Sequence, residues 1–147
     1  MTREQADLLG GIVTVVIYLA CILVFCLRLG GRQSAAHGAG AIWLLTAVPL
    51  VILLASAPRL SRPPLYVVQV SLMLFFIVAL LLLDYAFKIE FRKTSWAVIS
   101  FVTVFFAATG GMLGVAALAG RAWLAAALVL YLLMAVLAFV QRAATGM

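Results

Sequence analysis

The chain has 147 residues, of which 68% are hydrophobic and 10% are charged, and its formal net charge is +6. Soluble globular domains carry roughly 25% charged residues, and one soluble core of this size could not bury so much apolar surface. The composition therefore excludes an ordinary soluble domain. The apolar residues occur in runs of about 20, which is the helix length that crosses a bilayer. We predict an all-α integral membrane helical bundle of five transmembrane helices with short loops, forming a single transmembrane domain over residues 1–147.

The basic residues stand singly or in small groups at the ends of the apolar runs. This distribution is typical of residues that set membrane topology and contact anionic head groups. We expect the lipid bilayer as a partner, together with other membrane subunits or a second copy of the chain. We expect no nucleic acid.

The residues that usually carry chemistry are scarce. Both cysteines lie inside the first apolar run, and His37 is the single histidine, so we predict no disulfide framework and no site that needs two histidines. The sequence has no P-loop, no Rossmann glycine pattern and no nucleophile beside a base. We therefore expect no metal, no cofactor and no enzyme activity.

The five predicted spans cover residues 8–27, 38–57, 65–83, 96–120 and 122–140. Thr2 and Gln5 have the spacing of a capping box, which would start the first helix ahead of the membrane. Tyr18 falls near the middle of the first span, where its hydroxyl needs a partner in another helix or in the backbone.

Glycines and prolines predict where the next helices stop and start. Gly30 and Gly31 predict a loop over residues 28–37. Pro49 lies about halfway along the second span and predicts a kink, because proline removes one backbone hydrogen bond. We favour a packing adjustment there over a gating hinge. Pro64 is well placed as the first residue of the third helix.

The third span ends at the main polar segment of the chain. Asp84, Lys88 and Arg92 are spaced to form one charged stripe on a helix. Residues 87–92, however, alternate between apolar and charged, as in an extended segment along the interface. We expect the helix to continue about one turn past Asp84 and then to break. Asp84 is an ion-site candidate with Lys88 as its structural partner, and Lys88, Arg92 and Lys93 are expected to contact head groups.

Small residues cluster in the fourth span. Gly110 and Gly114 form a GxxxG motif and Gly111 extends the same small-residue face, which predicts close helix packing. Three partners for this face are open: a helix of this chain, of a second copy or of another subunit. Gly120 and Arg121 interrupt an apolar tract that is too long for one crossing, so we predict a turn between the fourth and fifth spans.

Two classes of function remain open. The first is a non-catalytic subunit, anchor or assembly factor of a membrane complex, because five short-looped spans without a chemical signature are typical of such proteins. The alternative is a small transporter, channel or lipophilic-ligand-binding protein with a pocket near mid-membrane. Polar residues inside the spans would line that pocket, and the candidates are Tyr18, Gln69 and Tyr131, with Asp84 at the membrane boundary. We expect Gln69 to face the bundle interior and to bond to a neighbouring helix.

With five spans the two termini lie on opposite faces of the membrane. Four basic residues then share the face of the N-terminus and six share that of the C-terminus. The positive-inside rule places the C-terminus in the cytoplasm and the N-terminus outside. Short loops and the absence of asparagine fit a bacterial plasma membrane, that is, a cell inner membrane.

Overall fold

The computed structural model describes residues 2–82 and 95–145. Within these ranges the chain is helical and contains no strand, which confirms the predicted all-α class. The helices are α1 (Arg3–Leu29), α2 (Gln33–Leu45), α3 (Ala47–Ser56), α4 (Pro64–Leu80), α5 (Ser95–Ala119) and α6 (Arg121–Thr145). The predictions for Asp84, Lys88, Arg92 and Lys93 lie outside the described residues.

Four segments are long and apolar enough to cross a membrane, which indicates a membrane protein. They are α1, the segment Ser34–Ser56 that joins α2 and α3, most of α5 and most of α6. The remaining apolar helix, α4, has 17 residues. At 1.5 Å per residue it measures about 26 Å, slightly less than the roughly 30 Å of a hydrocarbon core.

The N-terminal helix begins as its sequence predicts. The backbone N–H of Gln5 donates to the Thr2 hydroxyl at 3.2 Å, and the Thr2 N–H donates to the Gln5 side chain at 2.9 Å. This capping box is therefore confirmed. The helix ends at Leu29, followed by Gly31 in the left-handed region with φ +74°.

The predicted loop over residues 28–37 is wrong in length, because α2 already begins at Gln33. Its first residues include several alanines, the strongest helix former, and no proline stops the helix there. His37 consequently lies on a helix and not in a loop.

The kink predicted from Pro49 is observed one turn earlier, at Thr46, where α2 and α3 meet. Proline has no N–H to donate to the carbonyl of Leu45, and its ring crowds that carbonyl, so the regular hydrogen bonds break just ahead of it. The Thr46 hydroxyl donates to the carbonyl of Trp43 at 2.5 Å and satisfies one acceptor at the break. Pro64 is the first residue of α4, as predicted.

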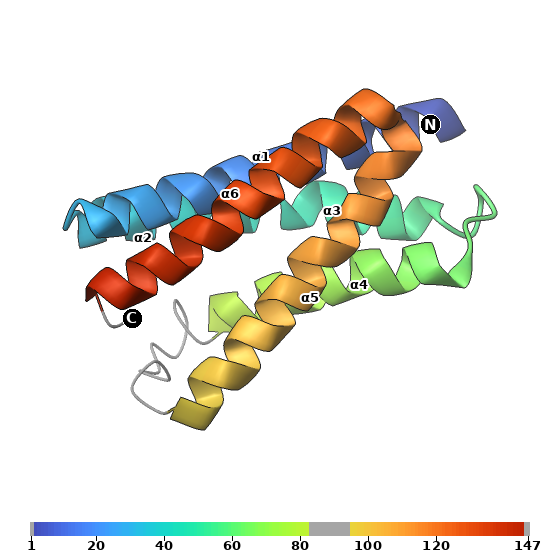
Figure 1. The fold of residues 1–147 in the computed structure, drawn as a ribbon. Coiled ribbons are helices and arrows are strands. Elements are labelled where there is room, and N and C mark those ends of the chain that lie inside the picture. Colours follow the sequence, from blue (N-terminus) through green and yellow to red (C-terminus); the bar gives the residue numbers. More distant parts are fainter. Residues whose placement is uncertain (1, 83–94, 146–147) are drawn as a thin grey trace.

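Helix α1 occupies the middle of the bundle and contacts α2, α3, α5 and α6, whereas α4 contacts α3 and α5. The two termini lie at opposite ends of the bundle (Figure 1). The core side chains Tyr18, Leu50 and Met112 are fully buried. Large apolar side chains such as Leu45 and Val129 are 68% and 65% exposed, as expected of surfaces that face lipid.

Helix α5 consists of two unlike halves, and this difference positions the site. Residues 107–120 include four glycines and five alanines, whereas residues 96–106 include Trp96, Phe101, Phe105 and Phe106. Small residues let helix backbones approach closely, and rings keep them apart. From the turn at Gly120, where φ is +137°, α5 and α6 diverge (Figure 1).

Helix α1 uses small residues in the same way near the turn between α5 and α6. A Cβ atom added at Gly10 would lie 2.7 Å from a methyl group of Val115, and one added at Gly11 would lie 2.9 Å from the Cβ of Ala119. The Thr14 hydroxyl lies between the two helices, 2.8 Å from the carbonyl of Gly10 and 3.3 Å from that of Met112. The helices are therefore in backbone-to-backbone contact at this end.

Candidate functional site

A cavity of about 530 Å³ lies at the other end of the bundle, where the bulky half of α5 faces α1, α2, α4 and α6. On α5 its lining runs from Val98 to Phe106, and on α6 it runs from Ala138 to Arg142. These segments are far from the Gly120 turn, in the region where α5 and α6 have separated. The cavity is thus a consequence of rings on α5 that prevent the helices from closing.

Seven of the 21 residues that line the cavity are aromatic. Trp43 and Phe76 meet edge to face with centroids 5.7 Å apart, and the Phe76 and Phe105 centroids are 5.6 Å apart. Contacts of this kind hold rings in fixed orientations. The aromatic residues of the wall are Phe25, Trp43, Phe76, Phe101, Phe105, Phe106 and Phe139. A wall of this composition favours an apolar ligand.

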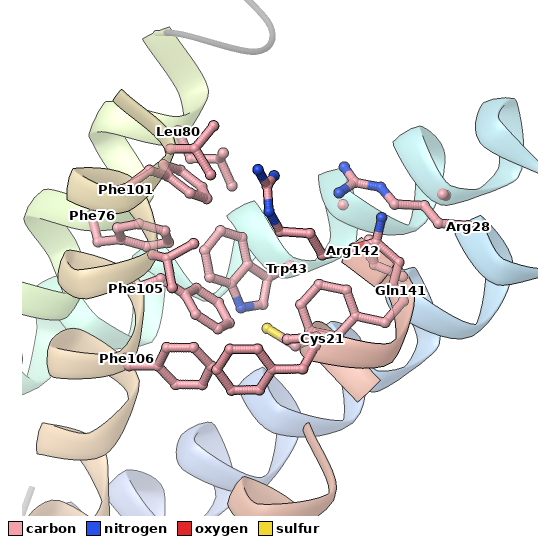
Figure 2. Close-up of a pocket in the computed structure, with 18 of the residues that line it drawn as sticks. Cys21, Arg28, Trp43, Phe76, Leu80, Phe101, Phe105, Phe106, Gln141 and Arg142 are labelled. Carbon is pink, nitrogen blue, oxygen red and sulfur yellow. The ribbon is translucent and has the colours of Figure 1, made fainter. Parts of the chain in front are cut away.

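The rim of the cavity carries basic and polar side chains. Arg28 comes from the last turn of α1 and Arg142 from the last turn of α6, and both line the cavity together with Gln141 and His37. Figure 2 shows Arg28, Gln141 and Arg142 on one side of the cavity, opposite the rings of α4 and α5. Arginines at helix ends reach the level of the lipid head groups. The mouth of the cavity therefore carries two cationic side chains.

Trp43 supplies a polar group inside the apolar wall. The residue is only 4% exposed, and its indole nitrogen Nε1 has no hydrogen-bond partner among the described residues. In Figure 2 this nitrogen is directed toward the middle of the lining side chains. An unsatisfied buried donor costs about 1–3 kcal/mol, and an oxygen atom of a ligand would remove that cost.

The cavity also has an opening at the outer surface of the bundle. Ile99 and Phe139 line it while being 67% and 65% exposed, and Thr103 between them is exposed as well. The Thr103 hydroxyl donates to the carbonyl of Ile99 at 2.8 Å, which leaves this opening apolar in character. This second opening therefore lies on the apolar outer surface of the bundle.

The two tyrosines proposed from the sequence lie together, but they do not line this cavity. Their ring centroids are 5.7 Å apart. The Tyr18 hydroxyl donates to the carbonyl of Thr109, and the Tyr131 hydroxyl donates to that of Phe106 at 3.2 Å. The prediction that Tyr18 needs a partner in another helix is confirmed. Both hydroxyls are used to join α1 and α6 to α5.

Gln69 is absent from the cavity lining as well. Its side chain lies against Gly111 and Gly114 of α5, and no hydrogen bond joins its amide to the described residues. Gly110 lies against the Tyr131 hydroxyl of α6, which a Cβ atom there would approach to 3.2 Å. The small-residue face of α5 is thus occupied by two helices of the same chain. The mid-membrane pocket expected around Tyr18, Gln69 and Tyr131 differs from the observed cavity, which none of these three residues lines and which reaches the last turns of α1 and α6.

A second buried polar cluster lies at the end of the bundle opposite the cavity. The Arg62 guanidinium is 2.5 Å from a carboxylate oxygen of Asp7, and its side chain is 1% exposed. It also lies 4.8 Å from the centre of the Tyr66 ring and 3.4 Å from the carbonyl of Arg3. This cluster joins the start of α1 to the start of α4. We refer to the ion pair between Asp7 and Arg62 as the clamp.

Sequence reasoning missed the cavity because its residues come from five helices. Two signals were available: the rings at the start of the fourth span, and the arginines Arg28 and Arg142 that end two spans on the same predicted face. Among the described residues, no group of three or more His, Cys, Asp or Glu could hold a metal ion. Comparison of the chain with protein-family models, with characterised proteins and with solved structures finds no match.

Proposed function

We propose that this chain is a five-span membrane protein that binds a lipophilic ligand in the cavity between α1, α2, α4, α5 and α6. One observation carries the proposal: an aromatic cavity of about 530 Å³ that is open both to the bilayer and to a polar mouth. Binding sites for small molecules typically measure about 300–1,000 Å³ and combine apolar walls with a few polar groups. Binding, transport or sensing of a lipophilic molecule would all use such a cavity, and none of them requires catalysis.

The five-span topology is supported by α4 and by the positions of the termini. Leu81 and Leu82 continue α4 in helical conformation, which lengthens it to about 29 Å at 1.5 Å per residue. An odd number of crossings agrees with termini at opposite ends of the bundle (Figure 1). We propose an N-terminus outside and a C-terminus in the cytoplasm of a bacterial plasma membrane. The basic mouth then faces the cytoplasm.

A non-catalytic subunit, anchor or assembly factor is the second candidate. It is supported by the outer face of α6, where Val129, Leu132 and Val136 are 56–65% exposed in one helical row. Lipid or a helix of another protein would cover such a row equally well. The two candidates predict different partners on the purified chain: a small molecule for the first and a second protein for the other.

Native mass spectrometry of the chain, extracted gently from its own membrane, tests the proposal. We expect a reproducible small-molecule mass on the chain. Ala138 lines the cavity on α6, and Ala126 is exposed three turns earlier on the same helix. Ala138→Phe should remove the added mass, whereas Ala126→Phe should retain it.

A stoichiometric second protein with no small molecule would favour the subunit candidate. A small molecule that Ala138→Phe retains would place the ligand elsewhere and refute the proposed site.

A further inference from the structure

Building on the proposed function, we infer that the ligand is an amphiphile with an anionic head group. Arg28 and Arg142 hold the head group at the mouth, and the aromatic cavity holds an apolar tail. The shared chemistry is a carboxylate or phosphate on a long apolar tail.

The basic side chains at the mouth of the cavity favour an anionic head group. Arg28 and Arg142 come from opposite ends of the sequence and converge on one cavity (Figure 2). Among the described lining residues there is no Asp or Glu. A guanidinium presents forked donors that match carboxylate and phosphate oxygens.

The size of the cavity suits the apolar part of a ligand. Its volume of about 530 Å³ lies within the range of about 300–1,000 Å³ that is typical of sites for small molecules. The cavity can therefore take up a long apolar tail.

Trp43 adds a polar contact below the mouth. Its N–H has no partner among the described residues, and in Figure 2 the nitrogen lies on the edge of the ring near Phe105, away from the guanidinium group of Arg142. An oxygen atom of a ligand that enters past the rim would accept a hydrogen bond from it. A plain hydrocarbon would leave this donor unsatisfied, which agrees with a ligand that carries oxygen at one end.

The experiment compares ligands that differ only in the head group. The purified full chain in nanodiscs of phosphatidylcholine is titrated with tritiated palmitate, palmitoyl lysophosphatidate and hexadecanol. We expect both anions to bind roughly tenfold more tightly than the alcohol, since only the anions form charge-assisted hydrogen bonds with the arginines. The ratio between the two anions distinguishes a carboxylate head from a phosphate head.

Variants test the residues that we assign. Arg28→Gln and Arg142→Gln should each weaken palmitate binding roughly tenfold and leave hexadecanol binding unchanged. Arg142→Lys should retain part of the preference, which guards against a folding defect. Arg59 is exposed in the loop at the opposite end, so Arg59→Gln is the matched control and should bind like the parent chain.

The outcomes separate this inference from the proposed function. Equal binding of hexadecanol and palmitate, abolished in both cases by Ala138→Phe, would refute the anionic head group and retain the lipophilic site. A preference for anions that survives in the Arg28→Gln, Arg142→Gln double variant would refute the assigned residues. Binding of none of the three ligands would refute both proposals.

Discussion

Near Gly120 small residues bring the helix backbones together, whereas at the opposite end of the bundle rings hold the same helices apart. At the closed end, Gly11 of α1 lies against Ala119 of α5, and Asp7 pairs with the buried Arg62. At the open end, Phe105 and its neighbours leave a cavity with a basic mouth. The residues that hold the helices together and the residues that line the cavity therefore lie at opposite ends of one bundle. Variants at the closed end should change stability, and variants at the open end should change binding.

The largest effect is expected at the clamp between Asp7 and Arg62. Asp7→Ala removes the partner of a guanidinium whose side chain is 1% exposed. Loss of one partner of a buried ion pair costs about 3–5 kcal/mol, because the other charge stays buried and uncompensated. SDS titration of the purified chain measures the change in the free energy of unfolding.

Glu4→Ala is the control, since it removes the same charge from an exposed residue in the first turn of α1. The double variant Asp7→Ala, Arg62→Leu should recover part of the loss. A loss as large in Glu4→Ala as in Asp7→Ala would contradict the clamp.

The close contact at Gly11 should give the second largest effect. In Gly11→Ala the new methyl group would lie 2.9 Å from the Cβ of Ala119 and 3.2 Å from the Trp123 ring, so α1 and α5 must move apart. Overpacking of this kind costs about 1–3 kcal/mol. Gly38 has open space around its Cα, and Gly38→Ala should be neutral or slightly stabilising. Thermal unfolding of the two variants in the same detergent compares them, and equal midpoints would argue against a tight α1–α5 contact.

A smaller effect is expected from the tyrosine that joins α1 to α5. Tyr18→Phe removes a buried hydrogen bond to the carbonyl of Thr109, which is worth about 1 kcal/mol. Tyr131→Phe should cost less, because Tyr131 is only half-buried. Palmitate binding should be unchanged in both variants, since neither hydroxyl lines the cavity. If either variant lost palmitate binding without losing stability, the assignment of stabilising and binding roles to different residues would be wrong.

The smallest effect on stability is expected at Trp43. Trp43→Phe removes a buried N–H that has no partner among the described residues, and the relief of an unsatisfied donor offsets part of the lost ring contact. We expect the free energy of unfolding to change by less than about 1 kcal/mol, while affinity for palmitate falls. Unchanged affinity together with a clear loss of stability would assign Trp43 to the core.

The sequence by itself predicted the class of the fold, because lipid imposes simple rules on composition and length. Runs of about 20 apolar residues can only be helices in a bilayer, and the starts at Thr2 and Pro64 follow from local chemistry. The turn at Gly120 was predictable for the same reason. The start of α2 was missed because the two glycines at 30 and 31 suggested a longer loop, although the alanines at the start of α2 favour a helix.

Only the tertiary structure decided where the site lies. Tyr18, Gln69 and Tyr131 were reasonable candidates, because a polar group in hydrocarbon needs a partner; the structure gives the two tyrosines carbonyl groups of α5 and sets Gln69 against glycines. The cavity depends on how far α5 and α6 diverge, and that angle depends on side-chain volumes summed over several helices. Sequence periodicity reports which residues face inward. It does not report whether the inward faces meet, and here they meet at one end only.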